Sequence, residues 1–316
     1  MNGTDYGSVL RIGTRGSRLA LWQATTVARR LEAHGTRCEI VVIKTTGDRS
    51  QTAPVPGDDS KRQFVKEIED ALASGHVDLA VHSAKDMTID LPAGLTIAAC
   101  LPREDPRDCV VLRSSRGEVA WAQVVERLNR PVSIATSSVR RTAQLTRVLP
   151  NARFVPIRGN VDTRLNKLDS GGSEALVLAS AGLRRLGFEE RVSATIPIEA
   201  CVPAPGQGII AIEARTDDKL VREALASIHD ARAATALAAE RAVVAELGGG
   251  CKLPLGAIAL LEEDVLVMQG VVAAADGSRI ARESIRGAAA EPDAAGARLA
   301  AALARGGARE LLDEVR

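Results

Sequence analysis

The feature that most constrains the fold is a strand–helix alternation that occurs twice along the chain. In the first set, a strand predicted at Val9–Thr14 leads into a helix at Ser17–Ala33; in the second, a strand at Val132–Ala135 leads into a helix at Ser137–Val148. Short β-branched runs alternating with helical patterns are typical of α/β layers. The segment IGTRGSRLA resembles IATSSVRRT, although chance similarity of two short strand–helix units is the alternative. We therefore predict an α/β protein with two similar lobes and a cleft between them.

Further elements extend both sets. The additional predicted strands are Cys38–Lys44, Val77–Val81, Leu95–Leu101, Asp108–Arg113, Arg153–Ile157 and Ala175–Leu178, and the additional helices are Gln63–Ser74 and Val161–Asp169. The proline-flanked segment PREDP is interpreted as a crossing between the lobes. The strand-like segment Cys201–Ala214 is interpreted as the return crossing that completes the first lobe.

The character of the chain changes at Ala231. The elements predicted from there on are a helix at Ala231–Leu247, strands at Ala257–Leu261, Asp264–Ala274 and Arg279–Gly287, and a final helix near Asp293–Glu314. The sequence therefore predicts three domains, namely a first α/β lobe (1–104 with 204–229), a second α/β lobe (105–203) and a small C-terminal α+β domain (230–316). Residues 48–62, rich in Pro, Gly and Asp, are interpreted as a lid loop in the first lobe.

The composition disfavours several classes of protein. The 316-residue chain has a formal net charge of +1 and contains two Trp, one Tyr and three Phe. General DNA binding relies on excess positive charge, and single-strand binding relies on aromatic stacking. We therefore expect no nucleic-acid partner.

The cysteines and the apolar segments indicate the compartment. The cysteines are widely spaced without a C-x-x-C pair, namely Cys38, Cys100, Cys109, Cys201 and Cys251. Their odd number argues against a disulfide framework, and scattered histidines give no metal-ligand spacing. No apolar run is long enough to cross a bilayer, and the first residues lack an apolar signal region. We expect a cytoplasmic protein with no metal and no membrane partner.

Arginines gather beside the strand–helix turns. The motifs ATSSVRR and IRGNVDTRL bring Arg140, Arg141, Arg158 and Arg164 into one segment, and Arg15 occupies the matching turn of the first set. Guanidinium groups bind carboxylate or phosphate through paired hydrogen bonds, and a helix N-terminus adds positive potential. Each feature alone has a structural interpretation, such as an N-cap or an exposed helix charge. Together they predict a site for a ligand with several anionic groups.

The HSAKD motif, His82–Asp86, follows the strand predicted at Val77–Val81. Lys85 and Asp86 are therefore expected at the carboxyl end of this strand, facing the cleft. A carboxylate among basic groups stays ionised, and it can stabilise a developing cation or shuttle protons. A structural Lys–Asp pair is the alternative, and the local sequence does not separate the two.

Cys251 lies in the Gly-rich segment GGGCKLPLG, where Lys252 is a positive neighbour. Backbone freedom and a nearby cation suit an accessible, nucleophilic thiol, whereas the other cysteines lie in or beside apolar strands and are interpreted as core residues. No His–Asn partnership is evident, which disfavours a papain-type hydrolase.

Several motifs occur in the order and spacing of one known family. They are TRGSRLALWQ, HSAKD, ATSSVRR, IRGNVDTRL, SAGLRRLG, PAPGQG and GGGCKLPLG, and they extend over nearly the whole chain. On these motifs the chain resembles the porphobilinogen deaminase (hydroxymethylbilane synthase) family. The resemblance implies a monomer of three domains, the first two of which resemble periplasmic binding proteins.

The resemblance also implies a reaction. Enzymes of this family join four porphobilinogen molecules head to tail, with loss of ammonia, into the linear tetrapyrrole hydroxymethylbilane for tetrapyrrole biosynthesis. Cys251 matches the cysteine that carries a dipyrromethane cofactor through a thioether, and Asp86 matches the catalytic aspartate. The positions matched to cofactor binding are Lys85, Thr136, Ser137, Ser138, Arg140, Arg141, Arg158 and Arg164. The positions matched to substrate binding are Arg15, Ser17, Gln23 and Arg185.

The chain departs from the family pattern at two places. Thr88 stands where the family usually has proline, and DDSKRQFVKE replaces a glycine-rich sequence in the lid. We therefore expect the turn after Asp86 and the lid to differ in flexibility from other members.

Two other functions use the same residues. A non-catalytic two-lobed anion-binding protein would need the helix N-termini and arginines but not a domain presenting Cys251. A nucleic-acid-binding protein would need more positive charge and more aromatic residues.

Overall fold

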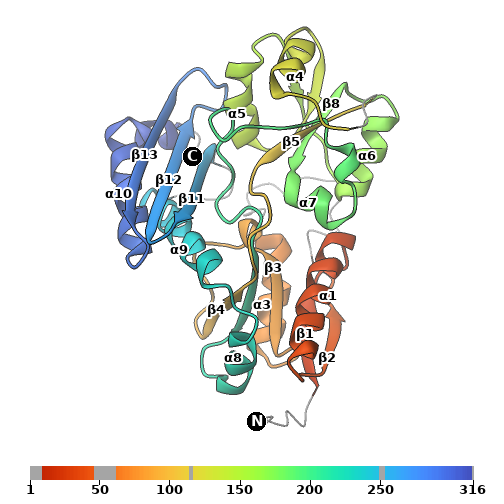
Figure 1. The fold of residues 1–316 in the computed structure, drawn as a ribbon, viewed down its shortest axis with the longest axis vertical. Coiled ribbons are helices and arrows are strands. Elements are labelled where there is room, and N and C mark those ends of the chain that lie inside the picture. Colours follow the sequence, from red (N-terminus) through yellow and green to blue (C-terminus); the bar gives the residue numbers. More distant parts are fainter. Residues whose placement is uncertain (1–8, 46–61, 114–116, 249–252, 315–316) are drawn as a thin grey trace. The chain divides into compact units, whose positions relative to one another are not determined.

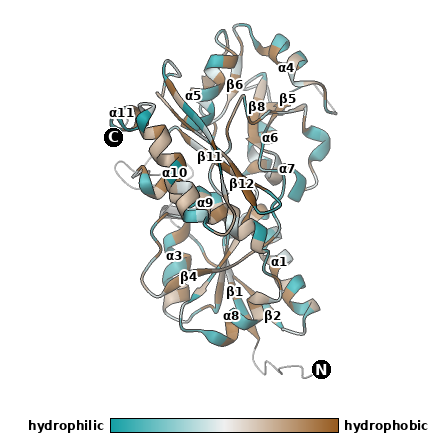
Figure 2. Ribbon diagram, turned by 60° about the vertical axis from the view of Figure 1, so that its left-hand side comes forward, coloured by the Kyte–Doolittle hydropathy of each residue, from teal (hydrophilic) through white to brown (hydrophobic). Residues whose placement is uncertain are grey.

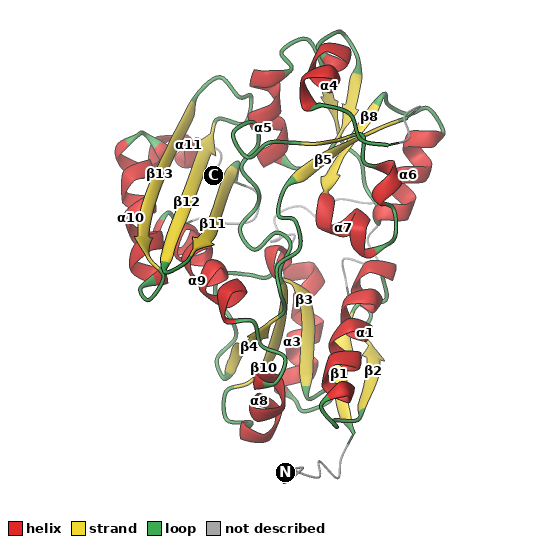
Figure 3. Ribbon diagram, viewed as in Figure 1, coloured by secondary structure: helices red, strands yellow, loops and turns green. Residues whose placement is uncertain are grey.

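The computed structural model describes residues 9–45, 62–113, 117–248 and 253–314. The chain forms two compact units, Met1–Arg103 with Ile209–Ala234 and Glu104–Gly208 with Thr235–Arg316 (Figure 1). Each unit contains a five-stranded sheet, and the second unit also contains a three-stranded sheet (Figure 3).

The first unit is a mixed sheet with helices on both faces. Its strand order is β2-β1-β3-β10-β4, where the strands are β1 (Leu10–Thr14), β2 (Cys38–Val42), β3 (Leu79–Ser83), β4 (Leu95–Cys100) and β10 (Ile210–Arg215). Successive side chains of a strand point to opposite faces, so the apolar residues divide into two layers. One layer packs against α1 (Arg18–Ala33) and α8 (Lys219–Ala226), and the other against α3 (Arg62–Ala73).

The second unit repeats this arrangement. Its five-stranded sheet has the order β7-β6-β8-β5-β9, where the strands are β5 (Asp108–Leu112), β6 (Ser133–Ala135), β7 (Arg153–Val155), β8 (Ala175–Ala179) and β9 (Ala194–Thr195). The helices α4 (Trp121–Leu128) and α5 (Val139–Val148) pack in one apolar layer, and α6 (Val161–Asp169) and α7 (Ser180–Arg185) in the other.

The two five-stranded sheets have similar topologies. In each, the first three strands of the order are parallel, whereas the fourth strand, β10 or β5, is antiparallel to both of its neighbours. The prediction of two lobes of similar topology is confirmed. The predicted return of the segment after Cys201 is also confirmed, because β10 inserts into the sheet of β1 to β4.

The C-terminal part is an antiparallel sheet packed with helices. The elements are α9 (Ala231–Glu246), β11 (Leu255–Glu262), β12 (Val265–Ala273), β13 (Ile280–Ala288), α10 (Pro292–Arg305) and α11 (Ala308–Asp313). The strands β11 and β12 are mostly hydrophobic (Figure 2). Gly296 of α10 lies so close to the Ala239 carbonyl of α9 that a Cβ atom there would overlap it. A side chain at this position would therefore force the two helices apart.

Some boundaries differ from the predictions. The strand predicted at Val77–Val81 is β3, Leu79–Ser83, and the single final helix is two helices interrupted at Gly306–Gly307, where Gly307 has φ +90°. The helices α4 and α8 were not predicted from the sequence. Each spans eight residues, which is too short for apolar periodicity to be distinctive.

Only the last part of the segment Cys201–Ala214 is a strand. Pro203 and Pro205 have no N–H to donate, and Gly206 and Gly208 have positive φ angles of 75° and 88°, so the backbone cannot continue a ladder there. Instead, the buried Glu240 carboxylate accepts hydrogen bonds from Gly206 N at 2.6 Å and Ala259 N at 2.7 Å. Glu240 thereby connects the part of this segment before β10 to β11 within the second unit.

Candidate active site

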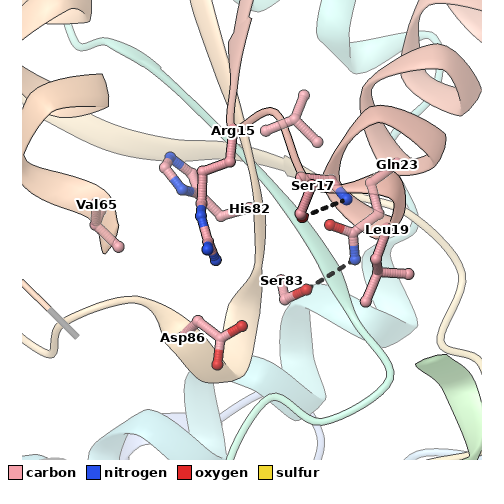
Figure 4. Close-up of a pocket in the computed structure, with 10 residues that line it drawn as sticks. Arg15, Ser17, Leu19, Gln23, Val65, His82, Ser83 and Asp86 are labelled. Carbon is pink, nitrogen blue, oxygen red and sulfur yellow. Dashed lines mark hydrogen bonds between the residues drawn. The ribbon is translucent and has the colours of Figure 1, made fainter. Parts of the chain in front are cut away.

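The first unit contains a pocket at one edge of its sheet (Figure 4). The residues that line it are Arg15, Ser17, Leu19, Ala20, Gln23, Val65, Val81, His82, Ser83 and Asp86. They come from the ends of β1 and β3 and from the helices α1 and α3. The sequence predictions for Arg15, Ser17, Gln23 and Asp86 thus converge on one place.

The topology explains this convergence. The strands β1 and β3 are parallel neighbours, so their carboxyl ends, Thr14 and Ser83, meet at the same edge of the sheet. After β1 the chain enters α1, where the Ser17 hydroxyl caps the helix by accepting from Ala20 N at 3.3 Å. After β3 it forms a single 3-10 turn, Ala84–Asp86, which carries Asp86 to the pocket.

A side-chain hydrogen bond fixes the two walls of the pocket to each other. Gln23 of α1 is 2% exposed, and its Nε2 donates to Oγ of Ser83 at 2.8 Å. This bond holds α1 against the last residue of β3, next to the turn that carries Asp86. Gln23 therefore has a positioning role whether or not it also touches a ligand.

The pocket brings a carboxyl group and a guanidinium group close together. Both Arg15 and Asp86 are half-buried, and Figure 4 shows the Arg15 side chain extending toward the Asp86 carboxylate. An ionised carboxylate here can stabilise a cation or accept N–H hydrogen bonds, and a guanidinium can bind a ligand carboxylate. Lys85, in the same turn, is also half-buried.

His82 and Ser83 line the pocket as well, although neither was predicted as a site residue. Both belong to β3, which extends two residues further than predicted. His82 is buried, with Nε2 at 3.2 Å from Oε2 of the fully buried Glu213 on the neighbouring strand β10. The alternation of side chains along a strand could have indicated this placement, but the strand was predicted to end at Val81, before His82 and Ser83.

In the second unit, Arg140 and Arg141 surround a buried carboxylate that the sequence analysis did not single out. Asp108 is 0% exposed; its Oδ2 lies 2.8 Å from Nη1 of Arg140, and its Oδ1 accepts from Nε and Nη2 of Arg141 at 3.0 and 2.8 Å. Nε2 of Gln207 donates to Oδ1 at 2.9 Å. We name these residues, Asp108, Arg140, Arg141 and Gln207, the Asp108 cluster.

The cluster strongly favours an ionised carboxylate. Burial alone raises the pKa of Asp108, but the charges and hydrogen bonds of Arg140 and Arg141 outweigh burial and hold it well below its ordinary value. The arginines are themselves only 5% and 6% exposed. Backbone carbonyls satisfy other N–H groups, with Arg140 donating to Val202 at 2.7 Å and Arg141 to Val177 at 3.0 Å.

The neighbouring hydroxyls shape the turn before α5. Ser138 is the N-cap, and its Oγ accepts from Arg141 N at 3.4 Å. Thr136 Oγ1 accepts from Ser138 N at 3.3 Å, and Ser137 Oγ donates to the Ile157 carbonyl at 2.6 Å. In this structure all three hydroxyls contact backbone, so they hold the turn that places the two arginines.

The other predicted arginines occupy different environments. Arg158 is exposed, and Arg164 is half-buried with Nε donating to the Gly159 carbonyl at 2.7 Å. Arg185 is 9% exposed and donates to the Gly208 carbonyl at 2.5 Å. Burial lowers the pKa of its guanidinium to about 10, against an opposing effect of Glu104, so Arg185 stays charged at neutral pH.

Two predictions fall outside the described residues. Cys251 is one, and the lid loop is the other, apart from its last residue, which begins α3. Among the described cysteines, burial raises the pKa of Cys109 and Cys201 to about 12 and that of Cys38 to about 11. Cys100 is 1% exposed. These thiols are therefore poor nucleophiles at neutral pH.

Neither a metal centre nor a spanning helix is found in the described part of the chain. No group of three or more His, Cys, Asp or Glu side chains there is arranged to hold a metal ion. No described helix combines the length and the apolar character that crossing a membrane requires.

Comparison with known proteins gives consistent matches over nearly the whole chain. Residues 10–223 match the family model described as porphobilinogen deaminase, dipyromethane cofactor binding domain, and residues 234–305 match porphobilinogen deaminase, C-terminal domain. Among relatives, the chain is 43% identical to a porphobilinogen deaminase of Geobacter metallireducens over 97% of this chain and 94% of that protein. It is 45% identical to one of Desulforudis audaxviator over 96% of this chain and 97% of that protein.

Solved structures give more distant matches. One is the second substrate-binding domain of a putative amino acid ABC transporter from Streptococcus pneumoniae, with a TM-score of 0.42 and 12% identity over 70% of this chain and 92% of that chain.

Proposed function

Because the chain belongs to the porphobilinogen deaminase family, we propose that it is a hydroxymethylbilane synthase. It joins four porphobilinogen molecules head to tail, with loss of ammonia, into a linear tetrapyrrole, and so serves tetrapyrrole biosynthesis. The observation that carries the proposal is the pocket in which Asp86 and Arg15 meet at the ends of β3 and β1.

The described residues fit the dipyrromethane cofactor that the family carries. A dipyrromethane with acetate and propionate groups is a polyanion, and the second unit offers several guanidinium groups at or near the edge where α5 begins. The residues proposed to hold its carboxylates are Lys85, Thr136, Ser137, Ser138, Arg140, Arg141, Arg158 and Arg164. When bound, the cofactor supplies the terminal pyrrole carbon to which the first substrate is joined.

Cys251 is the proposed attachment point, through a thioether. The described cysteines support this assignment by elimination, since burial raises the pKa of Cys38, Cys109 and Cys201, and Cys100 is buried. A thioether requires a sulfur that can reach a ligand and act as a nucleophile.

Asp86 is the proposed catalytic residue. Loss of ammonia leaves a positive charge on the porphobilinogen-derived azafulvene, and a fixed carboxylate at the pocket stabilises that charge electrostatically. The same carboxylate accepts a hydrogen bond from the pyrrole N–H and can take up a proton. Asp86 is half-buried, so partial exclusion of water strengthens these effects.

Arg15, Ser17, Gln23 and Arg185 are the proposed substrate-binding residues. Arg15 lines the same pocket as Asp86 and can pair with a substrate carboxylate, while Ser17 and Gln23 form the adjacent wall. Arg185 is held by the Gly208 carbonyl in the second unit. We include in the proposal the three-domain division of the chain and a monomeric, cytoplasmic enzyme; the near-neutral net charge of +1 supports the expectation of no nucleic-acid partner.

Intact mass is the direct test. We expect the purified protein to be heavier than its sequence by one dipyrromethane and to colour with Ehrlich's reagent, whereas Cys251→Ser has the unmodified mass and no activity. An unmodified mass in catalytically active wild-type protein would eliminate the proposal. A protein that binds porphobilinogen without consuming it would instead support the anion-binding alternative.

A further inference from the structure

The Asp108 cluster contains a carboxylate of the protein itself, at a place that is proposed to bind the carboxylates of a ligand. Arg140 and Arg141 carry two positive charges and Asp108 one negative charge, so these three side chains carry a net charge of +1. Arg140 contacts Asp108 at 2.8 Å, and the two hydrogen bonds from Arg141 are 3.0 and 2.8 Å long. The arginines are therefore already paired before any ligand carboxylate is considered.

The position of the arginines explains why an internal anion is needed. α5 begins at Val139, so Arg140 and Arg141 lie in its first turn. The positive end of the helix dipole disfavours cations there, and burial disfavours them further. Without a ligand, two buried guanidinium groups at this helix end need a counter-charge.

The fold supplies that counter-charge from a distant segment. Asp108 is the first residue of β5 and pairs with Ala179 at the carboxyl end of β8. This register places its carboxylate at the sheet edge where α5 begins. Gln207 donates to Oδ1 of the same carboxylate and to the Pro106 carbonyl at 2.7 Å, which gives Asp108 a further donor from the segment before β10.

We propose that Asp108 is a positioning residue whose carboxylate is the counter-charge of Arg140 and Arg141 and holds both side chains in place before a ligand binds. When a polyanionic ligand binds, its carboxylates also pair with these two arginines. The inference rests on the proposed function, because the ligand is the dipyrromethane cofactor. It predicts that Asp108 contributes much more stability to the apoprotein than to the holoprotein. An ion pair with only a structural role contributes equally to both forms.

The test compares Asp108→Asn with wild type in both forms. Apoprotein is produced in a host that makes no porphobilinogen, holoprotein in one that supplies it, and intact mass verifies each state. We expect Asp108→Asn to lower the Tm of the apoprotein by about 10 °C, since it leaves buried charges without their partner. The Tm of the holoprotein should fall by less than half as much, because the ligand carboxylates replace the missing charge.

A matched control and a second variant complete the experiment. Asp169, an exposed partner of Arg191 in the same unit, is changed to Asn and should alter neither form measurably. The double variant Asp108→Asn/Arg140→Gln restores a net charge of +1 through Arg141 alone. Its apoprotein should recover at least half of the lost Tm, or become soluble if the single variant does not fold.

The outcomes distinguish a counter-charge that is needed mainly in the apoprotein from an ion pair with only a structural role. A folded holoprotein of Asp108→Asn whose apoprotein is unfolded supports the proposal, as does a larger loss of Tm in the apoprotein. Equal losses in both forms, failure of folded Asp108→Asn to acquire cofactor, or no recovery in the double variant overturns it. A wild-type protein that never acquires the cofactor refutes the proposed function instead, and this inference with it.

Discussion

Nε2 of Gln23 on α1 donates to Oγ of Ser83 at the end of β3 over 2.8 Å, inside the wall of the pocket that contains Asp86. The bond joins a helix to a strand distant in sequence, and it lies one turn away from the proposed catalytic carboxylate. The position of Asp86 therefore depends on packing between elements as well as on its own turn.

We expect Gln23→Leu to lower kcat by about tenfold, because a lost buried hydrogen bond of about 1–1.5 kcal/mol lets the end of β3 shift, and to raise KM, because Gln23 is also a proposed substrate-binding residue. Steady-state kinetics on porphobilinogen consumption measure this. Thr26→Ala, on an exposed part of the same helix, is the control. A raised KM at unchanged kcat would show that Gln23 acts by binding substrate rather than by positioning Ser83.

Asp86→Asn should leave the fold intact and reduce turnover by about a thousandfold, since the amide cannot stabilise a cation electrostatically. Circular dichroism reports the fold, and ammonia release reports turnover. Asp90→Asn, at an exposed position shortly after the same turn, should retain full activity. Substantial turnover in Asp86→Asn would mean that another group supplies the negative charge.

Alkylation should distinguish the cysteines. In native apoprotein at pH 8 we expect iodoacetamide to modify Cys251 alone, because burial raises the pKa of Cys38, Cys109 and Cys201 and Cys100 is buried. Peptide mass mapping locates the modified residue. In holoprotein no cysteine should react, and unfolding in guanidinium should expose all of them. The Sγ atom of Cys201 lies 3.6 Å from Oδ2 of Asp108, so rapid native labelling of Cys201 would show that the Asp108 cluster is not closed to solvent.

Asp78 should give the first unit a pH-dependent contribution to stability. Its carboxylate accepts from Arg11 at Nε, Nη2 and the backbone N over 2.8 to 3.0 Å. Burial raises the pKa of Asp78, but the hydrogen bonds and charge of Arg11 outweigh it and the pKa is lowered. The contribution is therefore complete above the unfolded-state value of about 4 and is lost as pH falls through the lower folded-state pKa.

The corresponding variant is Asp78→Asn. We expect it to lower the free energy of unfolding by about 1 kcal/mol at pH 7, a modest value because Arg11 is partly exposed, and by progressively less below pH ~4. Urea denaturation at several pH values measures this difference. Glu262→Gln, in an exposed pair with Arg286, should show almost no effect at any pH. A deficit that is constant down to pH ~2 would rule out the ionic origin.

Gly296→Ala should destabilise the C-terminal part by about 1–3 kcal/mol, because the added Cβ overlaps the Ala239 carbonyl and the Ala242 side chain. Thermal unfolding measures the change. Gly172→Ala is the control, since a Cβ there meets only the Lys167 carbonyl at 3.4 Å. Equal stability of Gly296→Ala and wild type would show that α10 and α9 can separate without cost.

Much of the architecture follows from local pattern. The helix Val161–Asp169 is predicted with its observed bounds, and the resemblance of IGTRGSRLA to IATSSVRRT anticipates two lobes of similar topology. Prediction fails where the signal is not local. β3 extends to Ser83 because it pairs with β10, more than a hundred residues later in the chain, and this pairing makes His82 and Ser83 part of the pocket.

By itself, then, the sequence determined the α/β class, the doubled topology and the motifs around Asp86 and the arginines, because periodicity and spacing are properties of short segments. Only the tertiary structure decided the environment of each charge. Asp108 lies 33 residues from Arg141 in the sequence, yet its carboxylate accepts two hydrogen bonds from that guanidinium. Burial and counter-charges depend on which distant segments meet, and no local pattern encodes that meeting.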